Sequence, residues 1–518
     1  FQLDVAELML KVLPGASPEE LVRALLRHNL LTFDRLTELE GERRFRLYES
    51  VRLFALARLQ SMGAMEPTEQ LFEKSLIEYV RKWWWKNTRE GSLEGRRRTR
   101  LEMQGLLQVA RRTHRPEWRA WAAIIAAPVQ NGLGEKDLAL ELVRRSLAGI
   151  QEGSEQRAWV HIIDGTLRIF TSTESVLEML EGIKCDGIAL YRKLLIMSYG
   201  NSKNGNVERA RELALQALAI KGLSPTLLSR GHDRLGTYIA TGGDKAEAME
   251  HFQLALRYAR ESGDIATLAQ AHYSMGWFLQ RGGRHAEALE HHQQALKLAQ
   301  EDADHQIESQ ALACIGLNAD LLGDKQVSEA SLLRAMRVAR EFGATNLEAG
   351  HLNTLTRIYH EQERDEEALR AAMRARDLAR DLGSKQTEAI SESNVAAMLL
   401  QLKRAGPAID ALENALKLSM EVKDLRTVSV IQGNLGNAWI EKGRETRNRR
   451  DILKGIDLLR TGCASRRTNG FEPMAESELG LAKALIEVGQ KDEARKIIEM
   501  AKASLHELGN DLSRKLED

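Results

Sequence analysis

Small residues preceded by apolar ones recur along this chain every 40 residues. A small residue preceded by an apolar one stands at Gly236, Gly276, Gly316, Thr356, Ala396 and Gly436. Twelve positions after each of the first five comes a second small residue: Ala248, Ala288, Ser328, Ala368 and Ala408. Seven positions further on stand Ala255, Ala295, Ala335, Ala375 and Ala415. Registers that hold over five successive units predict a structural repeat.

Each unit has the pattern of two helices joined by a turn. Met275, Phe278 and Leu279 surround one of the small residues at helical spacing. Glycine-rich turns follow at 242–244, 282–284 and 323–324, where glycine allows a left-handed helix end. The second helix carries its two alanines on one face, which lets a neighbouring helix approach closely. We therefore expect helix pairs at this interval from about 228 to 440, with no sheet in that span.

This pattern resembles the tetratricopeptide repeat, in its long 40-residue variety. The segment AHYSMGWFLQRGGRHAEALEHHQQALKLAQ, residues 271–300, carries nearly every signature position of that helix pair. The proline that closes the 34-residue form is missing. The resemblance covers roughly 201–510 and implies an all-α solenoid of helix pairs. We expect degenerate repeats over 135–200, a turn lengthened by seven residues at KGRETRNRRD (442–451), and a tail at 511–518.

Residues 1–65 do not follow the repeat. Their pattern predicts a helix at DVAELMLKVL (4–13), a helix capped by Ser17, two strand-like pieces about Glu40-Gly41, and a further helix. That is the element order of a winged helix. RFRLYESVRLFALARL (44–59) resembles the segment after the nucleotide-binding domain in bacterial STAND signal-transduction ATPases of the AfsR and LuxR-like type. This resemblance implies a winged-helix-like domain over 1–65 and a helical linker over 66–134.

The same resemblance implies that an ATPase and an effector precede Phe1 in a longer protein. The chain begins without an initiator Met, which fits a piece of something longer. The printed residues contain no GxxxxGK[ST] motif, so we expect no nucleotide binding by that route.

Composition narrows the class of protein. Lys and Arg total 74, as do Asp and Glu, so no overall charge favours nucleic acid or a membrane surface. Aromatic residues at 5% and 8 prolines favour helices over sandwiches or barrels. The three cysteines lie far apart, which fits a reducing cytoplasm, and no apolar run approaches the roughly 18 residues of a membrane helix.

Catalytic and metal chemistry has no signature in the sequence. His291 and His292 are adjacent, and adjacent helical side chains diverge by about 100°, so they are poorly placed to chelate one ion. HExxH, GxSxG and paired Cys/His motifs are missing from the sequence. We assign no catalytic residue, no metal ligand and no cofactor, and expect no enzyme.

Two unusual runs each leave two interpretations open. Trp83-Trp84-Trp85 is either core and interdomain packing or an exposed partner surface. The basic run Arg96-Arg97-Arg98 is either a solvated, mobile loop or a nucleic-acid contact. We do not expect direct nucleic-acid binding, because in the resembled family of regulators a separate domain normally binds DNA.

A concave surface is where a helical solenoid binds partners. In the resembled repeat, first-helix positions at fixed offsets from the small residue line that groove. In its peptide-binding members, including kinesin light chain, an Asn two positions before the small residue holds a ligand backbone. Asn394 and Asn434 stand there, and the alternative is that both are solvated or make local hydrogen bonds. The predicted partner-binding residues are Tyr273, Trp277, Asn353, Arg357, His360, Asn394, Asn434 and Asn437.

The sequence is best interpreted as a ligand-sensing scaffold of a STAND-type regulator. A protein or peptide ligand in the groove would control the ATPase and effector that the resemblance places before Phe1. The alternative is a stand-alone peptide receptor of the quorum-sensing type, with a DNA-binding or phosphatase segment in front of a similar array.

Overall fold

The computed structural model describes residues 17–28, 30–35, 43–132, 135–169, 172–422, 424–468 and 475–507. The predicted helix at 4–13 and the tail at 511–518 lie outside these residues. Two compact units divide the chain, Phe1–Asn318 and Ala319–Asp518. Among the described residues, no helix has the length and apolarity needed to cross a bilayer.

The head of the chain contains a helix, a hairpin and a second helix. Helix α2 (Pro18–Arg27) begins with a capping box, in which Ser17 and Glu20 each accept a hydrogen bond from the other's backbone. Strands β1 (Leu31–Arg35) and β2 (Arg43–Leu47) pair antiparallel, with Phe33 opposite Phe45. Helix α3 (Glu49–Ser61) follows. The predicted strand pieces thus form a hairpin, and its turn lies outside the described residues.

A helical region connects the head to the regular repeats. Its helices are α4 (Met65–Glu90), α5 (Leu93–Leu101), α6 (Met103–Arg112), α7 (Pro116–Gly132), α8 (Lys136–Ser146), α9 (Glu155–Arg168), α10 (Thr173–Glu181), α11 (Gly187–Lys203) and α12 (Val207–Leu218). Trp83 and Trp84 are buried here, and Trp84 meets Trp121 and Trp159 edge-on at centroid distances of 5.6 and 5.0 Å. The core interpretation of the tryptophan run is confirmed.

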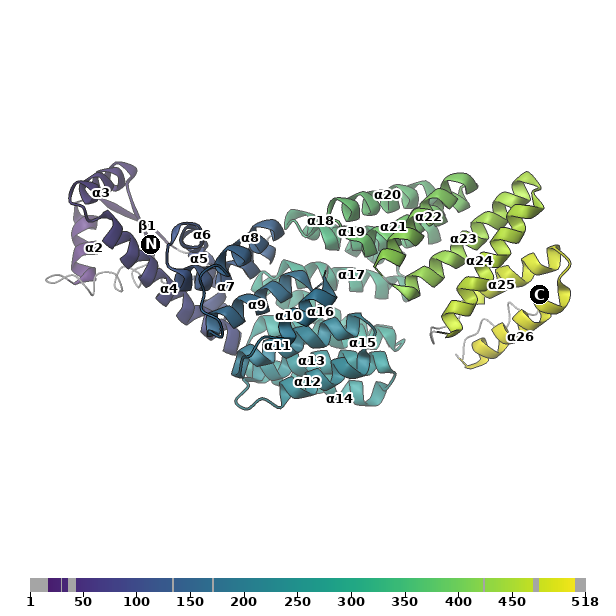
Figure 1. The fold of residues 1–518 in the computed structure, drawn as a ribbon, viewed down its shortest axis with the longest axis horizontal. Coiled ribbons are helices and arrows are strands. Elements are labelled where there is room, and N and C mark those ends of the chain that lie inside the picture. Colours follow the sequence, from purple (N-terminus) through teal and green to yellow (C-terminus); the bar gives the residue numbers. More distant parts are fainter. Residues whose placement is uncertain are drawn as a thin grey trace. The chain divides into compact units, whose positions relative to one another are not determined.

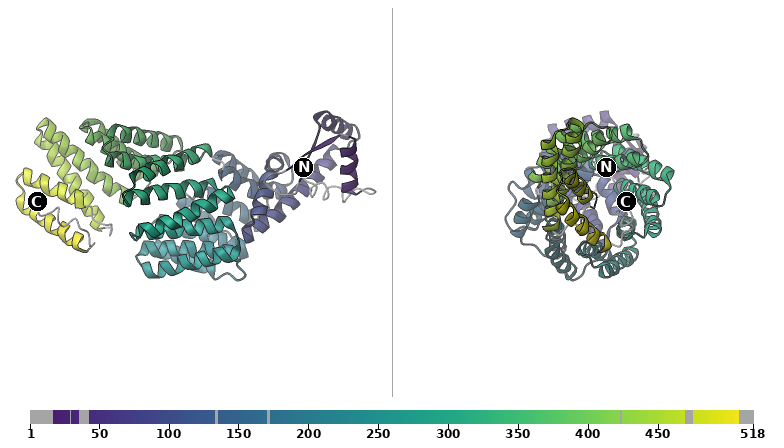
Figure 2. Two further views of the ribbon diagram at one scale, coloured as in Figure 1. Left: turned by 180° about the vertical axis from the view of Figure 1, so that it is seen from behind. Right: turned by 90° about the vertical axis from the view of Figure 1, so that its right-hand side faces the viewer.

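The repeat has the predicted period. First helices begin at the constant interval of the sequence pattern: α13 (Pro225–Gly242), α15 (Ile265–Arg281), α17 (His305–Leu321), α19 (Thr345–Glu361), α21 (Lys385–Gln401) and α23 (Leu425–Thr446). Second helices are α14 (Lys245–Ser262), α16 (His285–Asp302), α18 (Lys325–Glu341), α20 (Asp365–Asp381), α22 (Ala405–Glu421), α24 (Arg449–Thr468) and, after α25 (Ala475–Glu487), α26 (Lys491–Glu507). Figures 1 and 2 show that the two helices of each repeat lie antiparallel.

Each pair is fixed by local chemistry and by the small residues. Gly263 ends α14 at φ 66°, and Asp264 then caps α15 by accepting a hydrogen bond from the Thr267 amide. Ala288 and Ala295 of α16 have no exposed surface. Helix pairs packed on small residues at this period form a tetratricopeptide-like array, as predicted, and the described residues from 228 to 440 include no strand.

The insertion at 442–451 does not lengthen a turn, contrary to our prediction. Helix α23 continues to Thr446, and α24 begins at Arg449 after only two residues. Lys, Arg and Glu are good helix formers, so the added residues extend the helices instead. Arg447 adopts the left-handed conformation at φ 52° and ends α23.

Candidate functional site

Three of the predicted groove residues make hydrogen bonds between successive first helices, in two separate sets that join α19 to α21 and α21 to α23. Asn394 donates from Nδ2 to Oδ1 of Asn353 at 3.0 Å, and Asn353 donates from Nδ2 to Oγ of Ser391 at 3.0 Å. Asn434 donates from Nδ2 to Oγ of Ser393 at 3.2 Å. We call these five residues the Asn ladder. It links three successive first helices through side chains that are partly buried.

The Asn side chains of the ladder keep unused hydrogen-bonding capacity. Each amide nitrogen carries two hydrogens, and the ladder uses one of them at each Asn. A peptide bond presents one donor and one acceptor, which an Asn side chain can match together. The three Asn side chains therefore make local hydrogen bonds, as the alternative interpretation predicts. Each still has an amide hydrogen that could be donated to a peptide backbone.

Arg357 carries its charge beside two acids. It forms ion pairs with Glu361 and, at 3.1 Å, with Asp320, whose side chain is almost fully buried. Burial alone would lower the pKa of Arg357, but the two carboxylates raise it above its ordinary value. The Arg357 side chain remains 43% exposed. His360 contacts Asp365 at 2.7 Å, where α19 turns into α20.

The remaining predicted residues do not take part in the hydrogen bonds of the Asn ladder. Tyr273 and Trp277 belong to α15 in the N-terminal unit, whereas the Asn ladder belongs to the C-terminal unit. Tyr273 packs on His292 at a ring distance of 5.8 Å, and burial raises its pKa. Trp277 is half-buried under the Arg281 guanidinium at 5.0 Å. Asn437 of α23 faces Gly480 of α25, where a Cβ would lie 3.0 Å from its Oδ1.

Arg96 makes contacts that the sequence pattern does not predict. It lies in helix α5, not in a mobile loop, and donates to Asp264 at 3.1 Å and to Asp302 at 2.8 Å. Both carboxylates are almost fully buried, with 1% and 5% of their side chains exposed. Arg98, in turn, covers the ring of Trp83 at 4.4 Å. The solvated-loop interpretation of the basic run is therefore wrong, because two of its arginines are held inside the unit.

Two histidine pairs were also missed. Nδ1 of His232 lies 3.0 Å from Nδ1 of His251, and Nδ1 of His272 lies 3.1 Å from Nδ1 of His291. The second pair stands one repeat after the first, which is the signal that could have revealed them. Burial lowers the pKa of His232 and of His272 to about 4, and the partner histidine adds to each shift. Each pair is therefore neutral near pH 7, with one nitrogen donating to the other.

Metal-binding side chains and cysteines were the remaining candidates for chemistry in the described parts of the chain. Groups of three or more His, Cys, Asp or Glu placed to hold a metal ion are not found among those residues. Cys314 and Cys463 are buried, and burial raises the pKa of both thiols, so neither is a reactive thiolate near pH 7.

Comparisons with known proteins find repeat proteins at low identity. The family model of anaphase-promoting complex subunit 5 matches residues 234–282, 278–316 and 359–437, which is less than half of the chain. A search of curated proteins finds no significant match.

Among solved structures, the chain is similar to a Rap protein complexed with competence and sporulation factor. The identity is 15% and the TM-score 0.43, covering 62% of this chain and 97% of that one. It is also similar to a STAND protein with a tetratricopeptide repeat sensor from Pyrococcus horikoshii, at 15% identity and a TM-score of 0.39, covering 98% of this chain and 62% of that one. Aspartyl phosphate phosphatase F from Bacillus subtilis matches at 13% identity and a TM-score of 0.43, covering 68% and 94%.

Proposed function

We propose that this chain is the ligand-sensing repeat part of a STAND-type signal-transduction regulator of the cytoplasm. A protein or peptide segment binds along the first helices of the array and is held through its backbone by the Asn ladder. The observation that carries the proposal is the ladder itself, which places amides of Asn353, Asn394 and Asn434 at successive repeats along one line of helices. An extended peptide has its own amides at regular spacing, so a row of side-chain amides suits it.

The head of the chain supports the position of this array within a longer regulator. The order of α2, the hairpin and α3 agrees with the winged-helix-like segment that the resemblance places between an ATPase and its repeats. Ligand binding would then change the ATPase only through a difference in affinity between two conformations of the whole protein. The codons before Phe1 test this step, because a P-loop motif supports it and an immediate start codon favours the stand-alone peptide receptor.

Peptide binding is tested by selecting random peptides displayed on phage against the purified chain. Asn394→Ala and Asn434→Ala should each weaken the selected peptides by about tenfold or more, as loss of a well-placed hydrogen-bonding group does at an interface. Asn414→Ala is the matched control, because Asn414 lies on the second helix α22 and donates to Glu392 outside the ladder. Equal binding by the ladder variants and the control would contradict the proposal.

Arg357 provides a second test at the same surface. Arg357→Ala should weaken binding by about 2 kcal/mol if the guanidinium meets the ligand. The variant also leaves Asp320 without this partner, so it should be compared with Asp320→Asn and with the double variant. If the loss of binding disappears in the double variant, Arg357 acts only by holding Asp320.

A further inference from the structure

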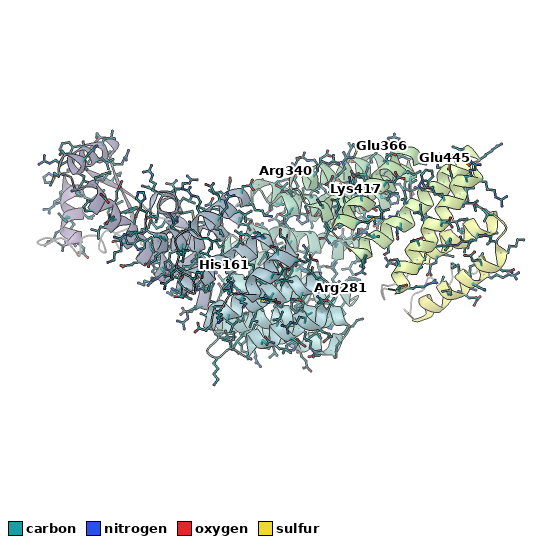
Figure 3. All side chains as sticks on the ribbon, viewed as in Figure 1. His161, Arg281, Arg340, Glu366, Lys417 and Glu445 are labelled. Atoms are coloured by element: carbon teal, nitrogen blue, oxygen red, sulfur yellow. The ribbon has the colours of Figure 1, made fainter. Side chains whose placement is uncertain are left out.

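Three arginines gather between helices α11 and α13 of the N-terminal unit. They are Arg192 of α11 and Arg230 and Arg234 of α13. We call them the arginine cluster. Helices α11 and α13 lie side by side in Figure 1, and Figure 3 draws their side chains in the same view, near the labelled His161 and Arg281.

Contacts at two levels fix how α11 and α13 face each other. The Tyr191 hydroxyl of α11 donates to the carbonyl oxygen of Leu227 on α13. About two turns further along α11, the ring centre of Tyr199 lies 5.6 Å from the guanidinium of Arg234. The two helices therefore run alongside each other over this stretch, and all three members of the arginine cluster stand within it.

Tyr191 stands at the centre of the arginine cluster. Arg192 follows it on α11, and a Cβ on Gly231, the residue after Arg230, would lie 3.5 Å from the Tyr191 hydroxyl oxygen. Burial raises the pKa of Tyr191, and the positive charges of all three arginines oppose that rise. Burial, and then the neighbouring charge of Arg230, lower the pKa of Arg192 to about 10. The cluster thus brings like charges close together.

The arginine cluster lacks matching carboxylates. Within the described parts of the chain, none of its members forms an ion pair, and the buried Nε of Arg192 has no hydrogen-bond partner. Asp233 adjoins Arg234 in sequence, but it is buried, it forms no ion pair there, and burial raises its pKa. Its charge offsets at most one of the three arginines. At least two positive charges therefore remain unbalanced.

The arginine cluster is open to solvent and is not part of the repeat pattern. Arg234 is exposed, and the other two members are half-buried. One repeat after Arg230 and Arg234 stand the uncharged Gln270 and Ser274. Helix pairs of this array therefore pack without a charge at these two positions, so packing does not account for the arginines.

We propose that the arginine cluster binds a phosphate group, carried either by a small molecule or by a phosphorylated partner chain. A phosphate dianion matches the two unbalanced charges, and its oxygens accept paired hydrogen bonds from guanidinium groups. A carboxylate has one charge and two oxygens, so it satisfies fewer of these donors. The proposal concerns the N-terminal unit alone and is independent of the Asn ladder, which belongs to the other unit.

Isothermal titration calorimetry of the purified chain with inorganic phosphate tests the site. Arg192→Gln and Arg234→Gln should each weaken binding by about tenfold or more, because each removes charge-assisted hydrogen bonds. Arg209→Gln is the matched control, since Arg209 lies on α12 and pairs with Glu212 at 2.9 Å. A short phosphoserine peptide distinguishes the two sources: tighter binding than inorganic phosphate supports a phosphorylated partner chain, and weaker binding supports a small molecule.

Melting temperatures separate the loss of the site from the loss of the fold. Arg192→Gln removes an unpaired charge, so in phosphate-free buffer it should melt no lower than the wild type. Phosphate should raise the melting temperature of the wild type and of Arg209→Gln, but not that of Arg192→Gln. The proposal is overturned if phosphate does not bind, if Arg192→Gln and Arg234→Gln bind it as the control does, or if a peptide with Glu in place of phosphoserine binds equally well.

Discussion

The imidazole of His292 occupies the space that a side chain on Gly276 would need. Its ring atoms lie 2.7–2.9 Å from the position that a Cβ on Gly276 would take. One repeat earlier, Phe252 stands at the same distance in sequence from Gly236, with its ring 3.3 Å from the equivalent point. At Gly236 and Gly276, the small residue thus leaves the space into which a second-helix side chain packs, which explains why a small residue is needed at these two positions.

His292 is poorly suited to this buried position. It has no exposed surface, and neither ring nitrogen has a hydrogen-bond partner within the described residues. Burial lowers its pKa to about 4, so the ring is neutral near pH 7. At the same register, the following repeat has the fully buried Leu332. His292→Leu should therefore raise the free energy of unfolding by about 1 kcal/mol, because two unpaired polar atoms leave the core.

Thermal and urea unfolding of His292→Leu and the wild type measure this effect. Leu332→His provides the reverse comparison and should destabilise the array. A lower melting temperature for His292→Leu would show that an unseen polar partner satisfies the imidazole.

The buried alanines of the second helices should not tolerate a larger side chain. Ala295 of α16 and Ala335 of α18 have no exposed surface. Leu at either position forces added methylenes into a tight helix contact, so each variant should lose about 1–3 kcal/mol of unfolding free energy. The exposed Ala286 and Ala330 on the same helices are the matched controls. Unchanged melting of both buried variants would mean that these helix contacts are not tight.

The sequence predicted the helix pairs because their packing rule is local and repeated. One small residue, such as Gly276, and two alanines, such as Ala288 and Ala295, define each pair, and the same arrangement recurs at a constant interval. The insertion after Lys442 was misjudged because charged residues fit a loop or an exposed helix equally well. Only the contacts of α23 with α24 decide between them.

The candidate site was less predictable, because its contacts join residues far apart in sequence. Arg96 reaches Asp264 and Asp302, which lie 168 and 206 residues away. Periodicity cannot reveal such a contact, since Arg96 stands outside the repeat. The Asn ladder was partly foreseen, as Asn394 and Asn434 share a register, but their hydrogen bonds to Asn353 and Ser393 depend on how successive first helices lie side by side.

The contact between Arg96 and the repeats should contribute substantially to stability. Arg96→Ala leaves Asp264 and Asp302 buried without their cation, so the variant should lose about 3 kcal/mol of unfolding free energy. The loss should change little with salt, because both carboxylates are shielded from solvent. Arg100→Ala, at an exposed position of the same helix, is the control. Equal stability of the two variants across urea titrations would contradict a structural role for Arg96.

The histidine pairs contribute to the way stability depends on pH. Burial lowers the pKa of His232 and of His272 to about 4, below the ordinary value of about 6.5 that each regains on unfolding. Between these values, the unfolded chain binds more protons than the folded one, so stability rises with pH. The contribution is complete above about pH 6.5, is lost as the pH falls toward 4, and is constant below that.

Removing one histidine of a pair should therefore flatten this dependence. His272→Gln eliminates one of the shifted groups, so the slope of unfolding free energy against pH should be smaller between about pH 6.5 and 4. Urea unfolding at a series of pH values measures the slope. Parallel curves for His272→Gln and the wild type would show that His272 accepts a proton in the folded state as readily as in the unfolded one.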